Sequence, residues 1–292
     1  MKKICSFLIL PVFCFFFMFI IAGCSNTQIN MYDVQTNSII SLSLEDYVAG
    51  VTAAEIDESF AESAIEAQSI VARTFAIWFV QNKKSKYAGA DISNDITEAQ
   101  AYTSKIPEKI KTACNNTKGK ILTYNGEIIL PYYCSNAGGK TSLPSDVFGI
   151  KLEYYHSVDS YEDNDNSKNF YWQAKIEKST ILYAMQKLGK NLASINTFEI
   201  GRKDDSNRAL TLIIGGQEVN ANNFRLAVGS TIMKSCLITK IAVNNSSITL
   251  EGKGYGHGVG LSQYGANILA NNNKDYNNVL LYFFKNCKIE DL

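Results

Sequence analysis

Glu55 is the residue whose type and position most directly suggest chemistry. The sequence predicts a helix from Ser43, because Ser43 and Asp46 form a capping pair and apolar residues such as Leu44 and Val51 recur at helical spacing. Steps of about 100° per residue bring Glu55 back to within roughly 20° of Leu44, on the apolar stripe. A carboxyl group there is partly desolvated, which raises its pKa toward the range that a general acid needs. Helical phase alone also allows a structural acid, or a terminal residue that turns to solvent.

A second helical pattern follows an acidic joint at residues 57–60 and carries two polar residues of interest. It is apolar over most of its circumference, which predicts the central buried helix of the domain. Gln68 lies within the apolar stripe, and Arg73 lies roughly opposite it. Because buried Gln and Arg side chains need partners, both are candidates for contacting a ligand or Glu55. Polar residues that are satisfied within the fold are an equal alternative.

Residues 252–270 form a glycine-rich segment that leads into a helix. Glycines occupy every second position from Gly252 to Gly260, with His257 among them, and Ser262 caps a helix over residues 263–270. Such a run suits a backbone that approaches a ligand or another chain segment closely. The spacing does not fit a dinucleotide-binding fingerprint, and no βαβ unit follows. His257 is then either a residue of a site or part of a structural turn.

The N-terminus reads as a leader. Lys2 and Lys3 precede an almost uninterrupted apolar run over residues 7–21, which ends in Ile-Ala-Gly-Cys. This ending resembles a bacterial lipobox and predicts a lipoprotein signal peptide over residues 1–24, with lipidation at Cys24. A plain membrane anchor is the alternative, although the run is short for a spanning helix. Residues 25–33 are expected to be a tether, and the body is expected to be extracytoplasmic, at the outer face of the cell membrane.

Charge and cysteine content exclude several classes of protein. The 28 basic and 28 acidic residues give no net charge, so nothing favours nucleic acid as a partner. Four cysteines lie beyond the lipobox, far apart and without Cys-x-x-Cys spacing, and they allow three disulfide connectivities. With two histidines in the chain, a metal cluster has few ligands. We therefore expect neither a metal nor a cofactor.

The pattern of elements predicts an α+β fold, with central buried helices packed on mainly antiparallel strands. A single domain over residues 34–292 has room for a smaller second lobe around residues 160–239. Beyond the helices already named, we expect helices at residues 107–116, 179–188 and 222–228, and strands at residues 34–42, 120–123, 127–133, 210–214, 236–243 and 247–251.

Ten short motifs lie in order along the chain, at residues 44–48, 53–55, 67–68, 72–74, 118–119, 122–124, 135, 138–141, 157–159 and 256–265. Each motif is weak alone, but together they cover nearly the whole mature chain. The ordered set resembles the stage II sporulation protein D family, which shares its domain with the amidase-enhancer proteins.

The resemblance implies a lytic transglycosylase that cleaves the glycan strands of peptidoglycan, preferring strands stripped of stem peptides, and leaves 1,6-anhydromuramic acid ends. Its catalytic acid is the Glu that ends Ala-Ala-Glu, which is Glu55 here. One carboxyl can carry out both proton transfers, because an internal hydroxyl replaces water. The polar positions that match the family and are expected to line the sugar groove are Gln68, Arg73, Ser135, His257, Gln263 and Tyr264. A cell-wall amidase is an expected partner.

Two departures from the family pattern, and two rival functions, accompany this interpretation. Glu66 stands where many members have Lys, and residues 93–100 lack the zinc ligands of some members. One rival is a noncatalytic peptidoglycan-binding module that recruits or activates an amidase. The other, a solute-binding lipoprotein, is disfavoured because the second half of the chain is rich in strands.

Overall fold

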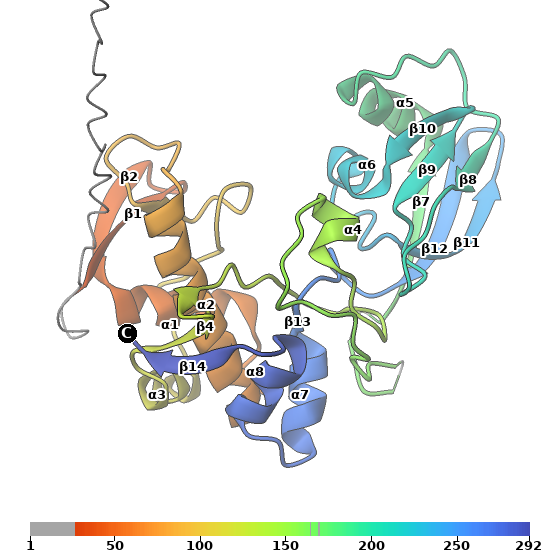
Figure 1. Ribbon diagram of the computed structural model, residues 1–292. Helices are drawn as coiled ribbons and strands as arrows, with labels where there is room; N and C mark the ends of the chain where they lie inside the picture. The colour runs from red at the N-terminus through yellow and green to blue at the C-terminus, as the bar shows by residue number, and fades with distance from the viewer. Residues whose placement is uncertain (1–26, 164, 169) are drawn as a thin grey trace, which may run out of the picture.

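Two hydrophobic cores organise the protein, whose computed structural model describes residues 27–163, 165–168 and 170–292. The larger core surrounds α1 and α2, and both ends of the described chain contribute to it. Its helices are α1 (Leu44–Glu55), α2 (Glu62–Asn82), α3 (Glu108–Asn116), α7 (Gln263–Asn271) and α8 (Tyr276–Phe283). Figure 1 shows α2 within this unit, with the C-terminal elements α7, α8 and β14 returning to it.

Three small sheets accompany these helices. Strand β1 (Gln28–Asp33) pairs antiparallel with β2 (Ser38–Ser43) and parallel with β3 (Ile92–Ser93). Strand β4 (Lys120–Tyr124) pairs antiparallel with both β5 (Glu127–Ile128) and β14 (Lys288–Asp291). Strand β6 (Tyr133–Cys134) pairs parallel with β13 (Leu261–Ser262), so the chain before residue 135 lies beside the start of α7.

The second core is built from one continuous stretch of chain, and the short helix α4 (Pro144–Phe148) precedes it (Figure 1). One antiparallel sheet has the order β11-β12-β7 and the other has the order β10-β9-β8. Their elements are β7 (Tyr171–Glu177), α5 (Lys178–Lys187), β8 (Phe198–Ile200), β9 (Thr211–Ile214), β10 (Gln217–Asn220), α6 (Ala221–Val228), β11 (Leu237–Val243) and β12 (Ser247–Lys253). The α+β prediction is confirmed. The buried residues of this core run from Trp172 to Leu250, beyond the range of residues 160–239 expected for a second lobe.

Local sequence explains where the helices begin. The Ser43 hydroxyl accepts a hydrogen bond from the backbone N–H of Asp46 and caps α1, as predicted. Ser262 caps α7 in the same way, by accepting from the N–H of Gly265. Helix α2 has no side-chain cap, but its interior is buried on nearly every face, so packing stabilises it.

The N-terminal segment requires a correction. Residues 28–33, expected as a tether, form strand β1, because Ile29 and Met31 alternate into the core and pair opposite Leu42 and Ile40 of β2. The strand expected at residues 34–42 is β2, which begins at Ser38. The predicted signal peptide and Cys24 lie outside the described residues.

The four cysteines beyond Cys24 are all buried and unpaired, so none of the three disulfide connectivities forms. Within the described ranges, no helix is both long and apolar enough to cross a membrane.

Candidate active site

Glu55 is the last residue of α1, and its carboxyl group is enclosed by three chain segments. The Tyr133 hydroxyl donates a hydrogen bond to Glu55 Oε1 at 3.1 Å. Burial raises the pKa of Glu55, while this bond and weaker hydrogen bonds from the Gln263 side chain and the Ala101 backbone act to lower it. The C-terminal end of α1 also disfavours a negative charge. The net result is a carboxyl group that holds its proton more tightly than usual, as a general acid requires.

The direction of the bond between Tyr133 and Glu55 is set by a buried chain of donors. Gln100 Nε2 donates to the Tyr133 hydroxyl at 3.3 Å, and the Tyr47 hydroxyl donates to Gln100 Oε1 at 3.4 Å. Tyr47 and Gln100 are almost fully buried. Since the Tyr133 oxygen accepts from Gln100, its single proton points at Glu55 Oε1. A proton carried on the other carboxyl oxygen, Oε2, does not compete with this bond.

Gln68 and Gln263 lie on the α7 side of Glu55. Gln263 Nε2 donates to Gln68 Oε1 at 3.5 Å, and both side chains are buried. Gln68 Nε2 is buried without a hydrogen-bond partner among the described residues. The structure thus brings the predicted residue Gln263 to Glu55 directly, and Gln68 to Glu55 through Gln263.

Ser135 and Tyr264 lie next to this group because β6 pairs with β13. The carbonyl group of Ser135 accepts from the backbone N–H of Tyr264 at 3.1 Å. The Tyr264 ring packs edge-on against Phe60, with the ring centres 5.0 Å apart. Tyr264 and Phe60 line a cavity of about 390 Å³ together with Asp57, which follows Glu55 by two residues. The cavity lies between α7 and the joint before α2, and neither Glu55 nor Tyr133 lines it.

His257 supports the site from behind and does not contact Glu55. Its Nδ1 accepts from the N–H of Val259 at 3.0 Å, so the proton of the neutral ring lies on Nε2. Burial lowers the pKa of His257 to about 3, and the nearby positive charges of Arg225 and Arg208 add to the effect. The ring also hydrogen bonds to the backbone of Tyr133. His257 is therefore a neutral residue whose ring holds the backbone of Tyr133 in position.

Arg73 lies outside this group. Its side chain is fully buried, and Nη2 and Nε contact the two carboxylate oxygens of Glu45, at 2.6 Å to Oε2 and 3.0 Å to Oε1. Nη1 donates to the carbonyl group of Lys120 at 3.1 Å. The guanidinium thus joins the start of α1 to the start of β4, and it has no contact with Glu55. Sequence phase identified a buried arginine that needs partners, but could not identify Glu45 as its partner.

Glu66 also faces away from Glu55, because residues two apart on a helix point to nearly opposite sides and Gln68 occupies the side of the site. Its carboxyl group accepts from Asn116 Nδ2 of α3 at 3.2 Å. Burial raises the pKa of Glu66, and the nearby acids Glu62 and Asp275 raise it further. Among the described residues, no cluster of three or more His, Cys, Asp and Glu side chains is arranged to hold a metal ion.

Tyr133, Gln100 and Tyr47 are the site residues that sequence reasoning missed. Gln100 lies in a segment with no periodic pattern, and Tyr47 reads as an ordinary apolar position of α1. Tyr133 carried the only usable signal, as a tyrosine at the end of an expected strand beside the small-residue loop that begins at Cys134.

Comparison with known proteins shows similarity along most of the chain. A family model described as Stage II sporulation protein matches residues 32–124. The chain is similar to Stage II sporulation protein D of Bacillus subtilis (strain 168), with 29% identity over 283 residues that cover 91% of this chain and 80% of that protein. It is 30% identical over 259 residues to an uncharacterized protein of Brachyspira hyodysenteriae, covering 86% of this chain and 67% of the relative. Similarity to the amidase enhancer of Bacillus subtilis is 25% over 284 residues, or 80% of this chain and 39% of that protein.

Proposed function

Because the chain belongs to the stage II sporulation protein D family, we propose that it is a lytic transglycosylase acting on the glycan strands of peptidoglycan, preferentially strands without stem peptides. The observation that carries the proposal is the isolated Glu55 carboxyl, with a raised pKa and one oxygen held by Tyr133. No described acidic side chain hydrogen bonds to it, which suits a reaction that needs a single proton donor and acceptor.

The proposed reaction uses the same carboxyl group twice. Glu55 donates its proton from Oε2 to the glycosidic oxygen as the bond from that oxygen to C1 of muramic acid breaks. The resulting carboxylate then takes the proton from the 6-hydroxyl of the same sugar, and the 6-oxygen forms a bond to C1. Water is not consumed, and the product is a 1,6-anhydromuramic acid end. A second carboxylate to activate water, as in an ordinary glycosidase, is not needed.

The test is the product of the purified protein acting on amidase-treated cell wall. We expect mass spectrometry to detect 1,6-anhydromuramyl ends with the wild-type protein and none with Glu55→Gln, which should stay folded because Gln keeps the size and an acceptor oxygen. Wild-type protein that binds strands without forming anhydro ends would refute the proposal.

The similarity to the amidase enhancer favours a second candidate, a noncatalytic peptidoglycan-binding module that recruits or activates an amidase. The chain covers 39% of that relative, so this likeness carries less weight. Stimulation of a cell-wall amidase by Glu55→Gln as strong as by the wild-type protein, with no anhydro ends from either, would favour the module.

For location, we propose that Cys24 carries a lipid anchor that holds the domain at the outer face of the cell membrane. The lipobox and the leader before it support this proposal. Labelling with a radioactive fatty acid, lost in Cys24→Ala, tests it.

A further inference from the structure

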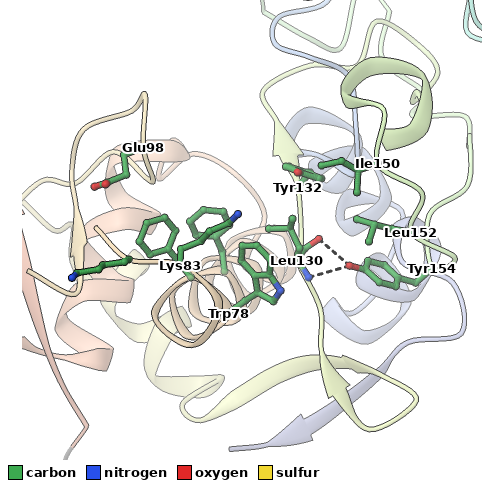
Figure 2. A pocket seen from close by; sticks show the side chains of 11 residues that line it. Trp78, Lys83, Glu98, Leu130, Tyr132, Ile150, Leu152 and Tyr154 are labelled. Carbon is green, nitrogen blue, oxygen red and sulfur yellow. Dashed lines mark hydrogen bonds between the residues drawn. The ribbon is translucent and has the colours of Figure 1, made fainter. Parts of the chain in front are cut away.

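A second cavity, which we call the aromatic pocket, lies along α2, the helix that carries Gln68. It has a volume of about 550 Å³ and lies between the C-terminal half of α2 and residues 130–154. Its aromatic lining consists of Phe75, Trp78, Phe79, Tyr132 and Tyr154. Figure 2 shows Glu98 at one end of the pocket and Tyr132 and Tyr154 at the other, with Trp78 between them. None of the residues proposed for catalysis lines it.

Sequence neighbours connect the aromatic pocket to Glu55. Tyr132 lines the pocket, and the next residue, Tyr133, donates to Glu55. On α2, Phe75 follows Gln68 by seven residues, or nearly two turns, so it lies on the same face about 10 Å further along the helix axis. A glycan strand is several sugar residues long, so a strand bound at Glu55 can extend over an axial distance of this size.

The walls of the aromatic pocket are held in place before any ligand binds. The backbone N–H of Leu130 donates to the Tyr154 hydroxyl at 3.1 Å, as Figure 2 shows. The hydroxyl of Tyr155 donates to the Leu130 carbonyl at 2.8 Å and accepts from the N–H of Tyr132 at 2.5 Å. Trp78 and Tyr132 remain half-buried, so part of each ring is accessible. Preformed, mostly aromatic pockets with a few polar groups at the edge are typical ligand sites.

The edge of the pocket is positively charged. Lys83 and Lys84 are exposed and form no ion pair with a described residue. The one acid in the lining, Glu98, is already engaged: its carboxylate accepts from Ser85, from Ser93 and from the backbone N–H of Lys86. The ammonium group of Lys83 lies 5.9 Å from the centre of the Trp78 ring. An apolar sugar face on Trp78 with an attached carboxylate would bring that carboxylate to the lysines.

We propose that the aromatic pocket binds a muramic acid residue of the glycan strand, with its ring on Trp78 and its free lactyl carboxylate at Lys83 and Lys84. This inference rests on the proposed function. The lactyl group carries a negative charge only where the stem peptide has been removed, and N-acetylglucosamine has no such group. The lysines therefore select stripped strands by charge, at a distance from the bond that is cut.

Binding to Glu55→Gln protein tests the subsite without cleavage of the probe. The probes are stripped glycan oligosaccharides and the same oligosaccharides with each lactyl carboxylate converted to its amide, measured by isothermal titration calorimetry. We expect the unmodified probe to bind about tenfold more tightly, and Lys83→Ala with Lys84→Ala to remove this difference. Trp78→Ala should weaken both probes by a similar factor. The added salt dependence of the charged probe should disappear with the lysines.

Matched controls separate the subsite from general effects. Lys187 lies 4.4 Å from the ring of Tyr183 in the second unit, so Lys187→Ala removes a comparable lysine and should bind both probes as the parent does. Because the only other tryptophan, Trp172, is buried in the second core, a change in tryptophan fluorescence on ligand addition reports on Trp78. Unchanged melting temperatures show that the variants are folded.

Three outcomes would overturn the inference. The first is equal affinity of the parent for the two probes, and the second is parent-like binding of the probes by the lysine double variant. The third is a lysine double variant that loses binding to anionic phospholipid vesicles but still binds the glycan strand. The last would assign the pocket to a membrane surface. Failure of the proposed function is a different result, because anhydro ends are measured with wild-type protein and binding is measured with Glu55→Gln. A protein that binds as expected but forms no anhydro ends would keep the subsite and lose the reaction.

Discussion

Tyr133→Phe is the substitution that tests most directly how the site controls its acid. The change removes one hydroxyl, which donates to Glu55 Oε1 at 3.1 Å and accepts from Gln100. This hydrogen bond stabilises the ionised carboxylate and lowers the pKa of Glu55, in opposition to burial, which raises it. Without the hydroxyl, the pKa of Glu55 therefore rises further. The protonated, catalytically competent form should persist to higher pH.

The size of the effect follows from the kind of bond that is lost. A hydrogen bond to a charged group contributes about 1.5–3 kcal/mol, so the ratio of protonated to ionised Glu55 at a given pH should increase about tenfold or more. The basic limb of the pH profile of kcat/KM should therefore move to higher pH. At the optimum we expect a rate about tenfold lower, because nothing then fixes the acidic proton on Oε2.

The assay is the initial rate of anhydro-end formation from stripped strands between pH 4 and 9. Tyr282→Phe is the matched control, because the hydroxyl of Tyr282 on α8 donates to the Asp159 carbonyl at 2.7 Å. This variant should leave the pH profile unchanged. A Tyr133→Phe profile that coincides with the wild type, or whose basic limb moves to lower pH, would refute the assigned role of the tyrosine.

Three further substitutions test the framework of the site. Arg73→Met should lower the free energy of unfolding by up to about 3–5 kcal/mol in urea titrations, because the half-buried Glu45 carboxylate loses its cation and keeps only the hydrogen bond from the Gly119 N–H. Folded protein should keep its KM if the arginine does not bind substrate. Glu55→Gln should raise the melting temperature at pH 7, by about 2–4 °C for each kcal/mol of added stability. The pKa of Glu55 is raised in the folded state, so the wild type loses stability as the pH rises. The difference in melting temperature between the variant and the wild type should therefore vanish below about pH 4. Gly258→Ala should lower the melting temperature more than Gly126→Ala, since its Cβ would lie 2.2 Å from Nη2 of the buried Arg208 and displace that guanidinium. Gly126 also has a positive φ but lies in open space, so Gly126→Ala should cost only about 1–2 kcal/mol. Equal melting temperatures for the two alanine variants would contradict this account.

Regular elements of the fold were predictable wherever a periodic pattern, a cap or a turn residue marked them. Helix α3 and strand β4 lie where the sequence predicts them, as does α7 with its Ser262 cap. Helix α8 was missed because its polar start, Tyr276-Asn277-Asn278, hides the apolar residues that follow, although Asp275 caps it. Strand β7 lies outside the strands that the sequence predicts, although its residues alternate between exposed and buried.

The candidate site also contains residues that the sequence could predict and residues that it could not. Glu55 and Gln68 were predictable because helical phase places a polar side chain on a buried stripe. The partners of those residues were not, since Tyr133 and Gln100 reach Glu55 from a strand end and a loop 78 and 45 residues away in sequence. Only the parallel pairing of β6 with β13 and the packing of the loop fix such distances. A single sequence carries no local signal that pairs either residue with Glu55.

Helical phase also cannot distinguish a buried polar residue that binds a ligand from one whose partners lie within the protein. Gln68 and Arg73 were equivalent candidates on the same helix. In the structure, the guanidinium of Arg73 finds a carboxylate within the fold, whereas Gln68 Nε2 keeps an unused donor beside Gln263. Unused hydrogen-bonding capacity in a buried position therefore separates the two more reliably than burial does.

The second unit contributes to the site through the glycine-rich segment. Arg208, from the loop before β9, lies flat against Gly258, where a side chain would collide with its guanidinium, and donates to the carbonyl group of Ala137 at 2.7 Å. Burial lowers the pKa of His257, the charges of Arg225 and Arg208 lower it further, and the neutral ring hydrogen bonds to the backbone of Tyr133. A change at Arg208 can thus reach Glu55 in three steps, through His257 and then Tyr133. This connection gives a physical reason for the proposed acid Glu55 to depend on a glycine-rich segment nearly two hundred residues later in the chain.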